Sequence, residues 1–485
     1  MTSPSPCLVW FRRDLRVSDH PALHAAVQTG APIIPVFIED ETRPLARGRA
    51  SQWWQHHALK ALCEQLETRG SRLILRRGQT GAILDELITS TGAQELVWIR
   101  TEEPVLDDLD RALATRLTER GLQVRAFRSR ILHAPDQVLN KQGKDFRVFS
   151  AFWRSVEPGL PDQPPLPAPD RLLAPDAWPH SEALDTWGLL PQQPDWAQGL
   201  RETWTPGEIG AQARLSAFLD QRIAGYGVDR DRPDLDMTSK LSPHLAWGDI
   251  SPREVLQATR HHPAVLDQAA DTRKFLSELG WREFSHYLLF HNRDLATRNF
   301  NPAFDAFPWA KDADALGRWQ TGQTGYPVID AGLRELWATG YMHNRVRMIC
   351  ASFLVKHLLI DWRDGLAWFD DTLADADCAN NPASWQWVAG SGADAAPYFR
   401  IFNPVTQGEK FDPDGLYVRR WVPELSRLPA RFIHQPWQAP ALVLMEAGVQ
   451  LDETYPSPMI ELKTGRDRAL AAYETVKAAR QPSAR

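Results

Sequence analysis

Residues 361–420 combine side chains whose types and spacing could do chemistry. They are two carboxylates two positions apart, two adjacent amides and two tryptophans two positions apart: Asp375, Asp377, Asn380, Asn381, Trp385 and Trp387. Charged side chains are almost never fully buried unless they are paired, and unpaired burial costs several kcal/mol or forces the group to become neutral. If this segment folds into the interior, its acids therefore need a buried polar partner.

A simpler interpretation treats the two acids as helix caps. Asp375 and Asp377 would then cap a helix that begins near Cys378, and both tryptophans would belong to the core. This explains each residue alone but not the whole set at this spacing. A flavin ring system with its ribityl chain and diphosphate would satisfy the need for a buried polar partner.

The same segment resembles the FAD-binding signature of the DNA photolyase/cryptochrome family, and the resemblance extends from Leu8 to about Tyr473. The matching motifs are Asp-x-Asp at 375–377, Asn381 four residues before Trp385, Trp385-Gln386-Trp387, and Arg-Ile-Phe-Asn-Pro at 400–404. The resemblance implies a bacterial type of photolyase that repairs cyclobutane pyrimidine dimers in DNA with light and reduced FAD. It also implies an N-terminal antenna domain and a helical C-terminal domain that binds FAD.

Composition places the chain among ordinary soluble globular proteins. Its 485 residues are 43% hydrophobic and 24% charged, which suits two or three domains. Four scattered cysteines without a CxxC motif or a histidine cluster argue against a disulfide framework and a zinc site, and we expect no metal. The net charge of -6 argues against a wholly basic nucleic-acid binder, so any positive surface for DNA must be local.

The N-terminus and the hydropathy pattern give no sign of a membrane or secretory protein. Residues 1–6 have no basic region and no long apolar run. No stretch approaches the roughly 18 apolar residues that would span a membrane. We therefore expect a cytoplasmic protein, and we expect it to be a monomer.

Five short apolar runs near the N-terminus alternate with helical segments. Because the runs are continuously apolar, they are typical of parallel strands covered on both faces. We predict strands at 8–11, 33–38, 73–75, 96–99 and 124–127, and helices at 21–29, 50–69, 79–91 and 104–120. Gly70 and Gly121 stand where helix C-caps are expected. The predicted fold class is α/β for this part, a doubly wound, Rossmann-like parallel sheet of five strands, although 11–16 lacks the GxGxxG of a dinucleotide-binding turn.

We expect three regions along the chain. They are the α/β antenna domain at 1–131, an interdomain linker at 132–206 and a large all-α FAD-binding domain at 207–485. The linker is rich in proline, which is typical of a connection that runs over the surface, and has one helix at 149–156. Helices of the third region are predicted at 207–224, 251–260, 271–290, 329–339, 344–359, 364–373 and 466–479.

The resemblance implies a set of residues that hold the FAD. A hydroxyl-rich stretch before a helix suits a diphosphate, although ordinary N-capping would also explain it. The implied cofactor-binding residues are Tyr226, Thr238, Ser239, Lys240, Leu241, Ser242, Arg282, Asn344, Arg347, Asp375, Asp377 and Asn381. Arg347 is expected to pair with Asp375 beside the flavin ring. Asn381 is expected to face the flavin N5, where an amide can both donate and accept.

Two helical segments are expected to line the substrate cavity. On the first helix, one face carries Glu278, Trp281 and Arg282. On the second helix, one face carries Asn344, Arg347 and Met348, and Arg345 is expected to turn outward. Chemistry on a base requires that the base be flipped out of the duplex, as photolyases do. The implied DNA and substrate residues are Arg230, Glu278, Trp281, Asn344, Arg345, Met348, Trp387 and Arg400, with Glu278 as a catalytic hydrogen-bond partner of the bases and Arg230, Arg345 and Arg400 at phosphates.

Further tryptophans match the electron-transfer chain of the family. These are Trp309, Trp362 and Trp385, which with Asn381 complete the implied catalytic set. Met348 matches the branch that repairs cyclobutane dimers, and the segment after His343 departs from the His-rich segment of the (6-4) branch.

Two alternatives remain for the function. The first is a cryptochrome-type blue-light photoreceptor, because 48–57 resembles the bacterial branch closest to plant cryptochromes; against it, we expect no long signalling tail, since Arg485 follows soon after the last family-like helix. The second is a flavin electron-transfer protein, which would not use Trp281, Met348 or Trp387. A second pigment, methenyltetrahydrofolate or a deazaflavin, stays open, because 102–106 has no Asn-Glu pair of the folate-binding type.

Overall fold

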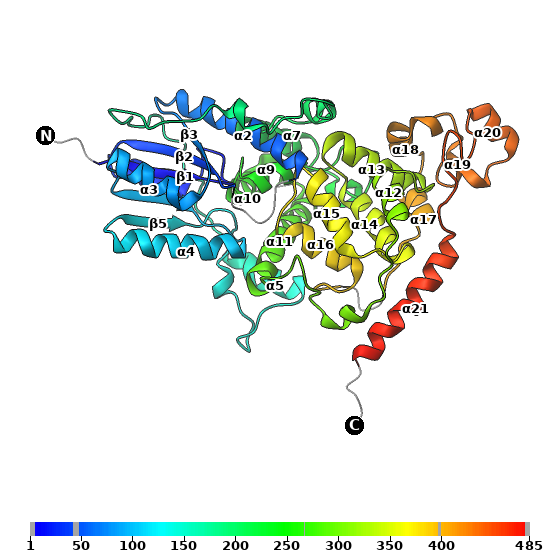
Figure 1. Cartoon of the computed structure of the whole chain (residues 1–485). Helices are drawn as coiled ribbons and strands as arrows, with labels where there is room; N and C mark the ends of the chain where they lie inside the picture. Colours follow the sequence, from blue (N-terminus) through cyan, green and yellow to red (C-terminus); the bar gives the residue numbers. More distant parts are fainter. Residues whose placement is uncertain (1–4, 42–47, 266, 396–398, 481–485) are drawn as a thin grey trace.

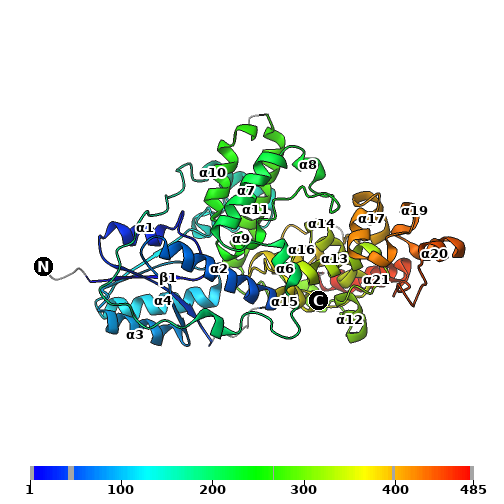
Figure 2. The same ribbon diagram turned by 90° about the horizontal axis from the view of Figure 1, so that it is seen from above.

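The computed structural model describes residues 5–41, 48–265, 267–395 and 399–480. Figures 1 and 2 show a β-sheet with its covering helices at one end of the molecule and the last helices of the chain at the other. Between them lies a large group of helices that contains the long helix α11 (Ala269–His291). The α/β and all-α parts expected from the sequence are therefore confirmed.

The sheet contains five parallel strands in the order β3-β2-β1-β4-β5. Its strands are β1 (Cys7–Phe11), β2 (Ile33–Glu39), β3 (Ile74–Arg77), β4 (Glu95–Ile99) and β5 (Gln123–Phe127), each within two residues of the prediction. Leu8 on the central strand lies opposite Ile34 on one side and Leu96 on the other. Every residue of β1 is buried, which explains the continuous apolar run in the sequence.

Four helices cover the two faces of the sheet. They are α1 (Pro21–Gln28), α2 (Arg49–Glu67), α3 (Thr80–Thr91) and α4 (Pro104–Glu119). Successive strand residues point to opposite faces. Val9 accordingly packs with residues of α1 and α2, whereas Trp10 packs with residues of α3 and α4. Gly70 and Gly121 have φ of +76° and +86°, so the predicted glycine positions after the helices are confirmed.

The proline-rich connection runs along the α/β part and is held there by backbone hydrogen bonds. Ile33 N–H donates to the carbonyl of Leu173 over 2.8 Å, and Glu182 N–H donates to that of Leu75 over 2.8 Å. The connection contains α5 (Phe149–Val156) and α6 (Gln198–Thr203). Trp187 is buried in the same hydrophobic cluster as α2, so tryptophan anchors this long segment to the sheet domain.

The helical part begins with α7 (Glu208–Gln221). It continues with α8 (Tyr226–Asp229), α9 (Ser242–Trp247), α10 (Pro252–His261), α11, α12 (Ala313–Gln320), α13 (Pro327–Thr339), α14 (Asn344–Ser352), α15 (Trp362–Thr372), α16 (Asn380–Ala389), α17 (Pro404–Phe411), α18 (Leu416–Trp421), α19 (Ala430–Ile433), α20 (Ala441–Ala447) and α21 (Leu462–Arg480). The helix predicted at 344–359 is confirmed as far as His357, and its geometry changes from α to π where the turn Phe353–His357 directly continues α14. None of the described helices is long and apolar enough to cross a membrane.

Candidate functional site

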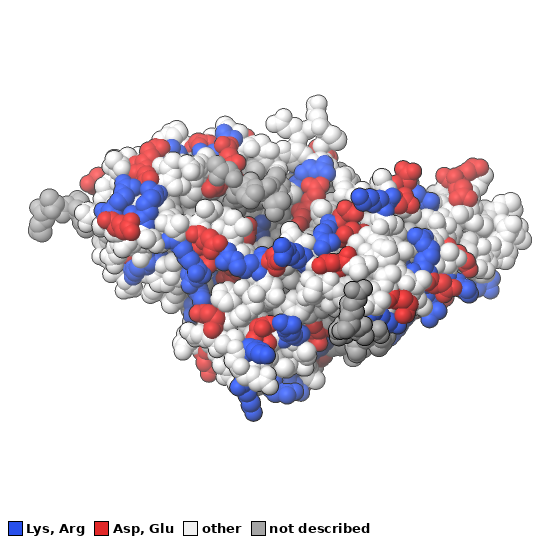
Figure 3. Space-filling view, turned by 60° about the horizontal axis from the view of Figure 1, so that its bottom comes forward, with Lys and Arg blue, Asp and Glu red and all other residues white. Residues whose placement is uncertain are grey.

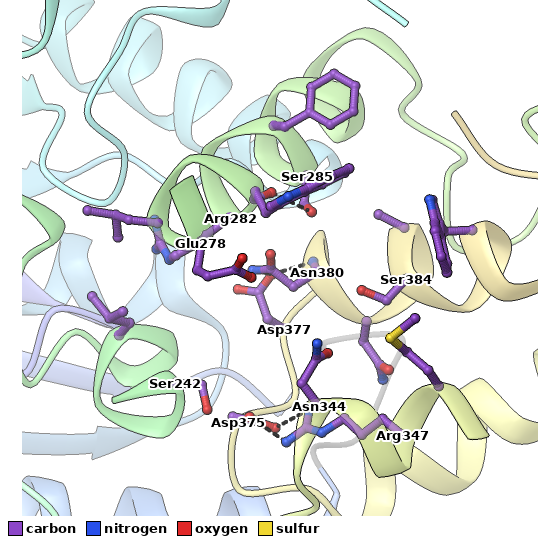
Figure 4. A pocket seen from close by; sticks show the side chains of 18 of the residues that line it. Ser242, Glu278, Arg282, Ser285, Asn344, Arg347, Asp375, Asp377, Asn380 and Ser384 are labelled. Carbon is purple, nitrogen blue, oxygen red and sulfur yellow. Dashed lines mark hydrogen bonds and ion pairs between the residues drawn. The ribbon is translucent and has the colours of Figure 1, made fainter. Parts of the chain in front are cut away.

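A cavity of about 570 Å³ lies among α8, α9, α11, α14 and α16. Its volume is within the range of small-molecule and cofactor sites. Figure 4 shows that α11 contributes Glu278 and Arg282, whereas α14 contributes Asn344 and Arg347. Segments that lie far apart in the sequence therefore meet at one place.

The α11 side of the cavity has the predicted i, i+3, i+4 face. Glu278, Trp281 and Arg282 all line the cavity. Glu278 forms ion pairs with Arg230 and, at 3.0 Å, with Lys274. Arg230 therefore faces an acid inside the cavity, with its side chain 11% exposed, whereas we expected a phosphate contact. The Trp281 ring stacks on Phe149 of α5 with centroids 3.9 Å apart, a contact that the sequence did not indicate.

The α14 side has the predicted face and one correction. Asn344, Arg347 and Met348 line the cavity as expected. The expectation that Arg345 turns outward is wrong, because it also lines the cavity and pairs with Asp231 at 2.7 Å. The preceding residue His343 caps the helix, since its Nδ1 accepts the N–H of Arg345 over 3.2 Å. Burial lowers the pKa of His343 to about 4, so the ring stays neutral near pH 7.

A charge pair joins α14 to the segment before α16. Arg347 Nη1 and Nη2 donate to the two carboxylate oxygens of Asp375 over 3.1 and 2.8 Å, while Arg347 Nε donates to the carbonyl of Met342 over 2.7 Å. The Asp375 side chain is 4% exposed and that of Arg347 is 24% exposed. Burial opposes the charge of Arg347, but the adjacent carboxylate raises its pKa above the ordinary value. Two-pronged pairs of this kind are strong and fix orientation.

The two carboxylate oxygens of Asp377 have different surroundings. Its Oδ1 accepts the N–H groups of Ala379 and Asn380 over 2.9 and 2.8 Å, so the capping interpretation holds for Asp377 but not for Asp375. Its Oδ2 has no hydrogen-bond partner among the described residues and lies 3.6 Å from Nε2 of His286. Burial alone would raise the pKa of Asp377, but His286 and Arg282 beside it lower it.

The amide of Asn381 lies between the cavity and the protein surface. It lines the cavity, and its Nδ2 donates to Oδ1 of Asp370 over 2.6 Å. Asp370 is an exposed residue of α15. The sequence did not indicate this acid, because only the fold brings the end of α15 beside the start of α16.

The hydroxyl-rich stretch is only partly brought into the site. Tyr226, Ser239, Leu241 and Ser242 line the cavity. Thr238 and Lys240 are absent from the lining: the Thr238 hydroxyl lies 3.4 Å from that of Tyr341, and Lys240 pairs with Asp236 at 2.8 Å. Lys240 also has a φ of +50°, which turns the chain at this point.

The tryptophans divide into two groups. Trp385 and Trp387 line the cavity, and Trp385 is 2% exposed. Gly365 of α15 lies against the Trp385 ring, and Trp362 stands three residues earlier on that helix, fully buried. The bridge between Ala310 and Ile360 places the partly buried Trp309 near the start of α15. Of the other expected residues, Arg400 lies outside this cavity and lines a second one.

The residues of the cavity fit FAD on the evidence of their unsatisfied groups. Arg282 Nη2 and Asp377 Oδ2 are buried and have no hydrogen-bond partner among the described residues, although Asp377 Oδ2 lies 3.6 Å from His286 and 4.0 Å from Arg130. Buried polar groups normally have a hydrogen-bond partner. Trp385 supplies an aromatic wall, and Ser239 and Ser242 supply hydroxyls. A large cofactor with an aromatic ring, a polyol chain and phosphates meets all of these groups. Among the described residues, no group of three or more histidines, cysteines or acids could hold a metal ion.

Comparisons with known proteins agree with this geometry. A family model described as DNA photolyase matches residues 7–170, and one described as the FAD binding domain of DNA photolyase matches 275–475. The chain is 51% identical to a deoxyribodipyrimidine photo-lyase of Agrobacterium fabrum over 98% of both chains. It is 37% identical to Cryptochrome-2 of Arabidopsis thaliana over 97% of this chain and 79% of the relative.

Solved structures show the same relationship. The crystal structure of a bacterial class III photolyase from Agrobacterium tumefaciens superposes with a TM-score of 0.96 at 50% identity, covering 99% of both chains. The cryptochrome of Synechocystis sp. PCC6803 superposes with a TM-score of 0.88 at 30% identity, covering 97% of this chain and 100% of the other. The chain belongs to the DNA photolyase/cryptochrome family.

Proposed function

We propose that the protein is a light-driven deoxyribodipyrimidine photo-lyase that uses FAD to split cyclobutane pyrimidine dimers in DNA. One observation carries the proposal. A single cavity contains a buried charge pair and buried polar groups without hydrogen-bond partners, together with aromatic and polar side chains suited to bases. The chain that forms this cavity is 51% identical to a protein named deoxyribodipyrimidine photo-lyase. The substrate would reach the cavity as a flipped-out dimer, at a cost of a few kcal/mol that is lowest for damaged bases.

The residues of the chain provide binding and orientation. FAD, when bound and reduced, supplies an electron to the dimer under blue or near-UV light and takes it back after the ring opens, so there is no net redox change. The Arg347–Asp375 pair and Asp377 would hold the cofactor in place. Asn381, with an amide that donates and accepts, would hydrogen-bond the polar edge of the cofactor ring. The remaining proposed cofactor contacts are Tyr226, Ser239, Leu241, Ser242, Arg282 and Asn344.

A second group of residues would receive the dimer. Trp281 and Trp387 would stack on it, each worth about 1–3 kcal/mol if they behave like other base–aromatic contacts. Glu278 would hydrogen-bond the base edges, and Met348 would supply a soft apolar contact. Because Glu278 is ion-paired in the free protein, it would exchange one of these partners for the dimer.

The electron-transfer role of the other tryptophans is supported by their places between the cavity and the surface. Trp385 lies at the cavity, Trp362 is fully buried and Trp309 is partly exposed. Indole is oxidisable, so this order suits the reduction of FAD from the protein surface.

The domain limits, the oligomeric state and the location are proposed from the sequence. We propose domain limits at 1–131, 132–206 and 207–485, a monomeric state and a cytoplasmic location. Figure 3 shows lysines and arginines interspersed with acids on the face in view, which suits a local rather than a general contact with DNA. A second pigment, methenyltetrahydrofolate or a deazaflavin, would be revealed by the absorption spectrum of freshly purified protein.

A photoreceptor function is the second candidate, because the chain is also 37% identical to a plant cryptochrome. The affinity for DNA in the dark separates the two. A photo-lyase should bind dimer-containing DNA much more tightly than undamaged DNA, because the dimer fills the cavity. Equal affinity for both DNAs would favour the photoreceptor.

The experiment that tests the proposed substrate site replaces Trp281. In Trp281→Ala we expect dimer binding to fall by about 10-fold or more, from the loss of one stacking contact, while FAD content is retained. Trp281→Phe should recover most of the affinity. Trp337→Ala, at a half-exposed position outside the cavity, is the matched control. Loss of repair with FAD retained would exclude a flavin electron-transfer protein, whereas unchanged dimer affinity and full repair in Trp281→Ala would contradict the assignment of Trp281 to the substrate site.

A further inference from the structure

The side-chain amide of Asn381 has a single hydrogen-bond partner among the described residues. Its Nδ2 donates to Oδ1 of Asp370 over 2.6 Å, and its own Oδ1 accepts no hydrogen bond from the described part of the chain. The backbone of Asn381 is placed separately, because its N–H donates to the carbonyl of Asp377 over 3.2 Å. Asp370 is therefore the group that determines how the amide is turned.

The chemistry of Asp370 determines which end of the amide faces it. An ionised carboxylate only accepts hydrogen bonds, whereas an amide has a donor nitrogen and an acceptor oxygen. The nitrogen of Asn381 must therefore turn toward Asp370, and the oxygen on the same carbon turns away from it. Asn381 lines the cofactor cavity, and Asp370 is absent from its lining. The end of the amide that faces the cavity is therefore the carbonyl oxygen.

The surroundings of Asp370 keep it in this position. Helix α15, which carries Asp370, packs closely on α16, because a Cβ on Gly365 would lie 2.2 Å from the Trp385 ring. Asp370 is an exposed residue, but its carboxyl group turns toward the start of α16. Partial burial of that group raises the pKa of Asp370 to about 6, although the hydrogen bond from Asn381 and the charge of Arg13 lower it. At pH 8 the group is ionised and can only accept.

An acceptor that faces the cavity distinguishes the two redox states of a flavin. In the reduced ring N5 carries a hydrogen and can donate, whereas in the oxidised ring N5 has a lone pair and can only accept. A carbonyl oxygen at N5 therefore stabilises the reduced ring and repels the oxidised one. The amide nitrogen at the same place would have the opposite effect. Hydrogen bonds to the ring are one way in which a protein tunes the electronics of its cofactor.

We propose that Asp370 is a positioning residue that turns the carbonyl of Asn381 toward N5 of the bound FAD and thereby favours the reduced cofactor. Asp370 would act from outside the cavity, without contacting FAD or DNA. This inference rests on the proposed function, which places the polar edge of the FAD ring at Asn381. It deepens that function, because it gives an acid of α15 control over the redox state that repair requires.

The first test compares two neighbouring acids of α15. Asp370→Leu removes the acceptor that holds the Asn381 amide, so the amide can rotate and donate to oxidised N5. Asp371→Leu removes the same charge one residue away, where the carboxylate pairs with Arg49 at 2.6 Å, and leaves the amide held. The midpoint potential of FAD bound to each variant and to wild type is measured at pH 8 by redox titration, followed by the flavin absorbance.

Loss of the orientation and loss of a charge shift the potential in opposite directions. A freed amide should lower the ratio of the affinities for reduced and oxidised FAD by about tenfold, the effect of roughly one hydrogen bond. For a two-electron couple this is a midpoint potential about 30 mV lower. Removal of a negative charge alone would raise the potential, because a nearby negative charge disfavours electron uptake. We expect the lower potential in Asp370→Leu and not in Asp371→Leu. An unchanged or raised potential in Asp370→Leu would overturn the inference.

The second test shows whether Asp370 acts through Asn381. In Asn381→Ala there is no amide to turn, so the addition of Asp370→Leu should leave the midpoint potential unchanged. A further fall of the same size in the double variant would overturn the positioning role, because Asp370 would then act on FAD by another route. If a variant releases FAD during purification, titration of the apoprotein with oxidised and with reduced FAD gives the same affinity ratio.

Failure of the proposed function would be distinguishable from failure of this inference. The potentials are measured without DNA and without illumination, whereas the proposed function fails if dimers persist in the light with reduced FAD bound. Normal repair by wild type, together with equal potentials in wild type and Asp370→Leu, would overturn the role of Asp370 alone.

Discussion

Replacement of Asp375 by asparagine isolates the charge pair on which the cofactor site depends. The variant keeps the size of the side chain but removes the charge that faces Arg347. Arg347 would retain its 2.7 Å hydrogen bond to Met342 and lose both charge-assisted contacts to Asp375. Removing one partner of a buried pair costs about 3–5 kcal/mol. Because the Arg347 side chain is 24% exposed, we expect a loss nearer 2–3 kcal/mol in the free energy of unfolding.

The assay is a double-mutant cycle with Arg347→Met and the double variant. Unfolding is followed in denaturant, and FAD retention is measured for each protein. We expect the double variant to be more stable than the sum of the two single losses predicts, by at least about 1.5 kcal/mol, because neither charge is left alone. We also expect all three variants to bind FAD more weakly than wild type. Additive losses would refute the coupling, and unchanged FAD affinity would refute the assignment of the pair to the cofactor site.

Three further predictions concern pH, packing and salt. His343 has a pKa of about 4 in the folded protein against 6.5 normally, so the unfolded chain binds a proton more readily. The free energy of unfolding should therefore be fully present above pH 7 and fall by about 2 kcal/mol between pH 7 and 5. His343→Asn keeps a helix cap and should flatten this part of the pH profile, and an unchanged slope would contradict the role of His343. A Cβ on Gly365 would lie 2.2 Å from the Trp385 ring, so Gly365→Ala should lower stability by about 1–3 kcal/mol and weaken FAD binding, whereas a variant as stable as wild type would show that the ring can move. Arg400→Ala should make the log–log salt dependence of DNA binding shallower by about 1, and an unchanged slope would show that this arginine contacts no phosphate.

The sheet and the helix faces could be predicted because local patterns determine them. A continuous apolar run such as that of β1 implies burial on both faces, and the register then follows from parallel pairing. The i, i+3, i+4 spacing placed Glu278, Trp281 and Arg282 on one face without knowledge of any partner.

Contacts between distant segments could not be predicted in the same way. The stack of Trp281 on Phe149 and the hydrogen bond of Asn381 to Asp370 depend on how whole helices pack. Arg345 lies at the cavity because Asp231, from another segment, pairs with it, and its helical position alone indicated the opposite. The helix predicted at 344–359 changes to π geometry over Phe353–His357, and local propensity does not indicate that change.

In the proposed function, one cavity brings reduced FAD and a flipped-out dimer together. The most direct test is the dimer content of single-stranded DNA after illumination with blue or near-UV light in the presence of purified, FAD-loaded and reduced protein. We predict that dimers disappear in the light, persist in the dark, and persist in the light when the flavin is removed. Unchanged dimer content in the light, with FAD and DNA both shown to be bound, would contradict the claim.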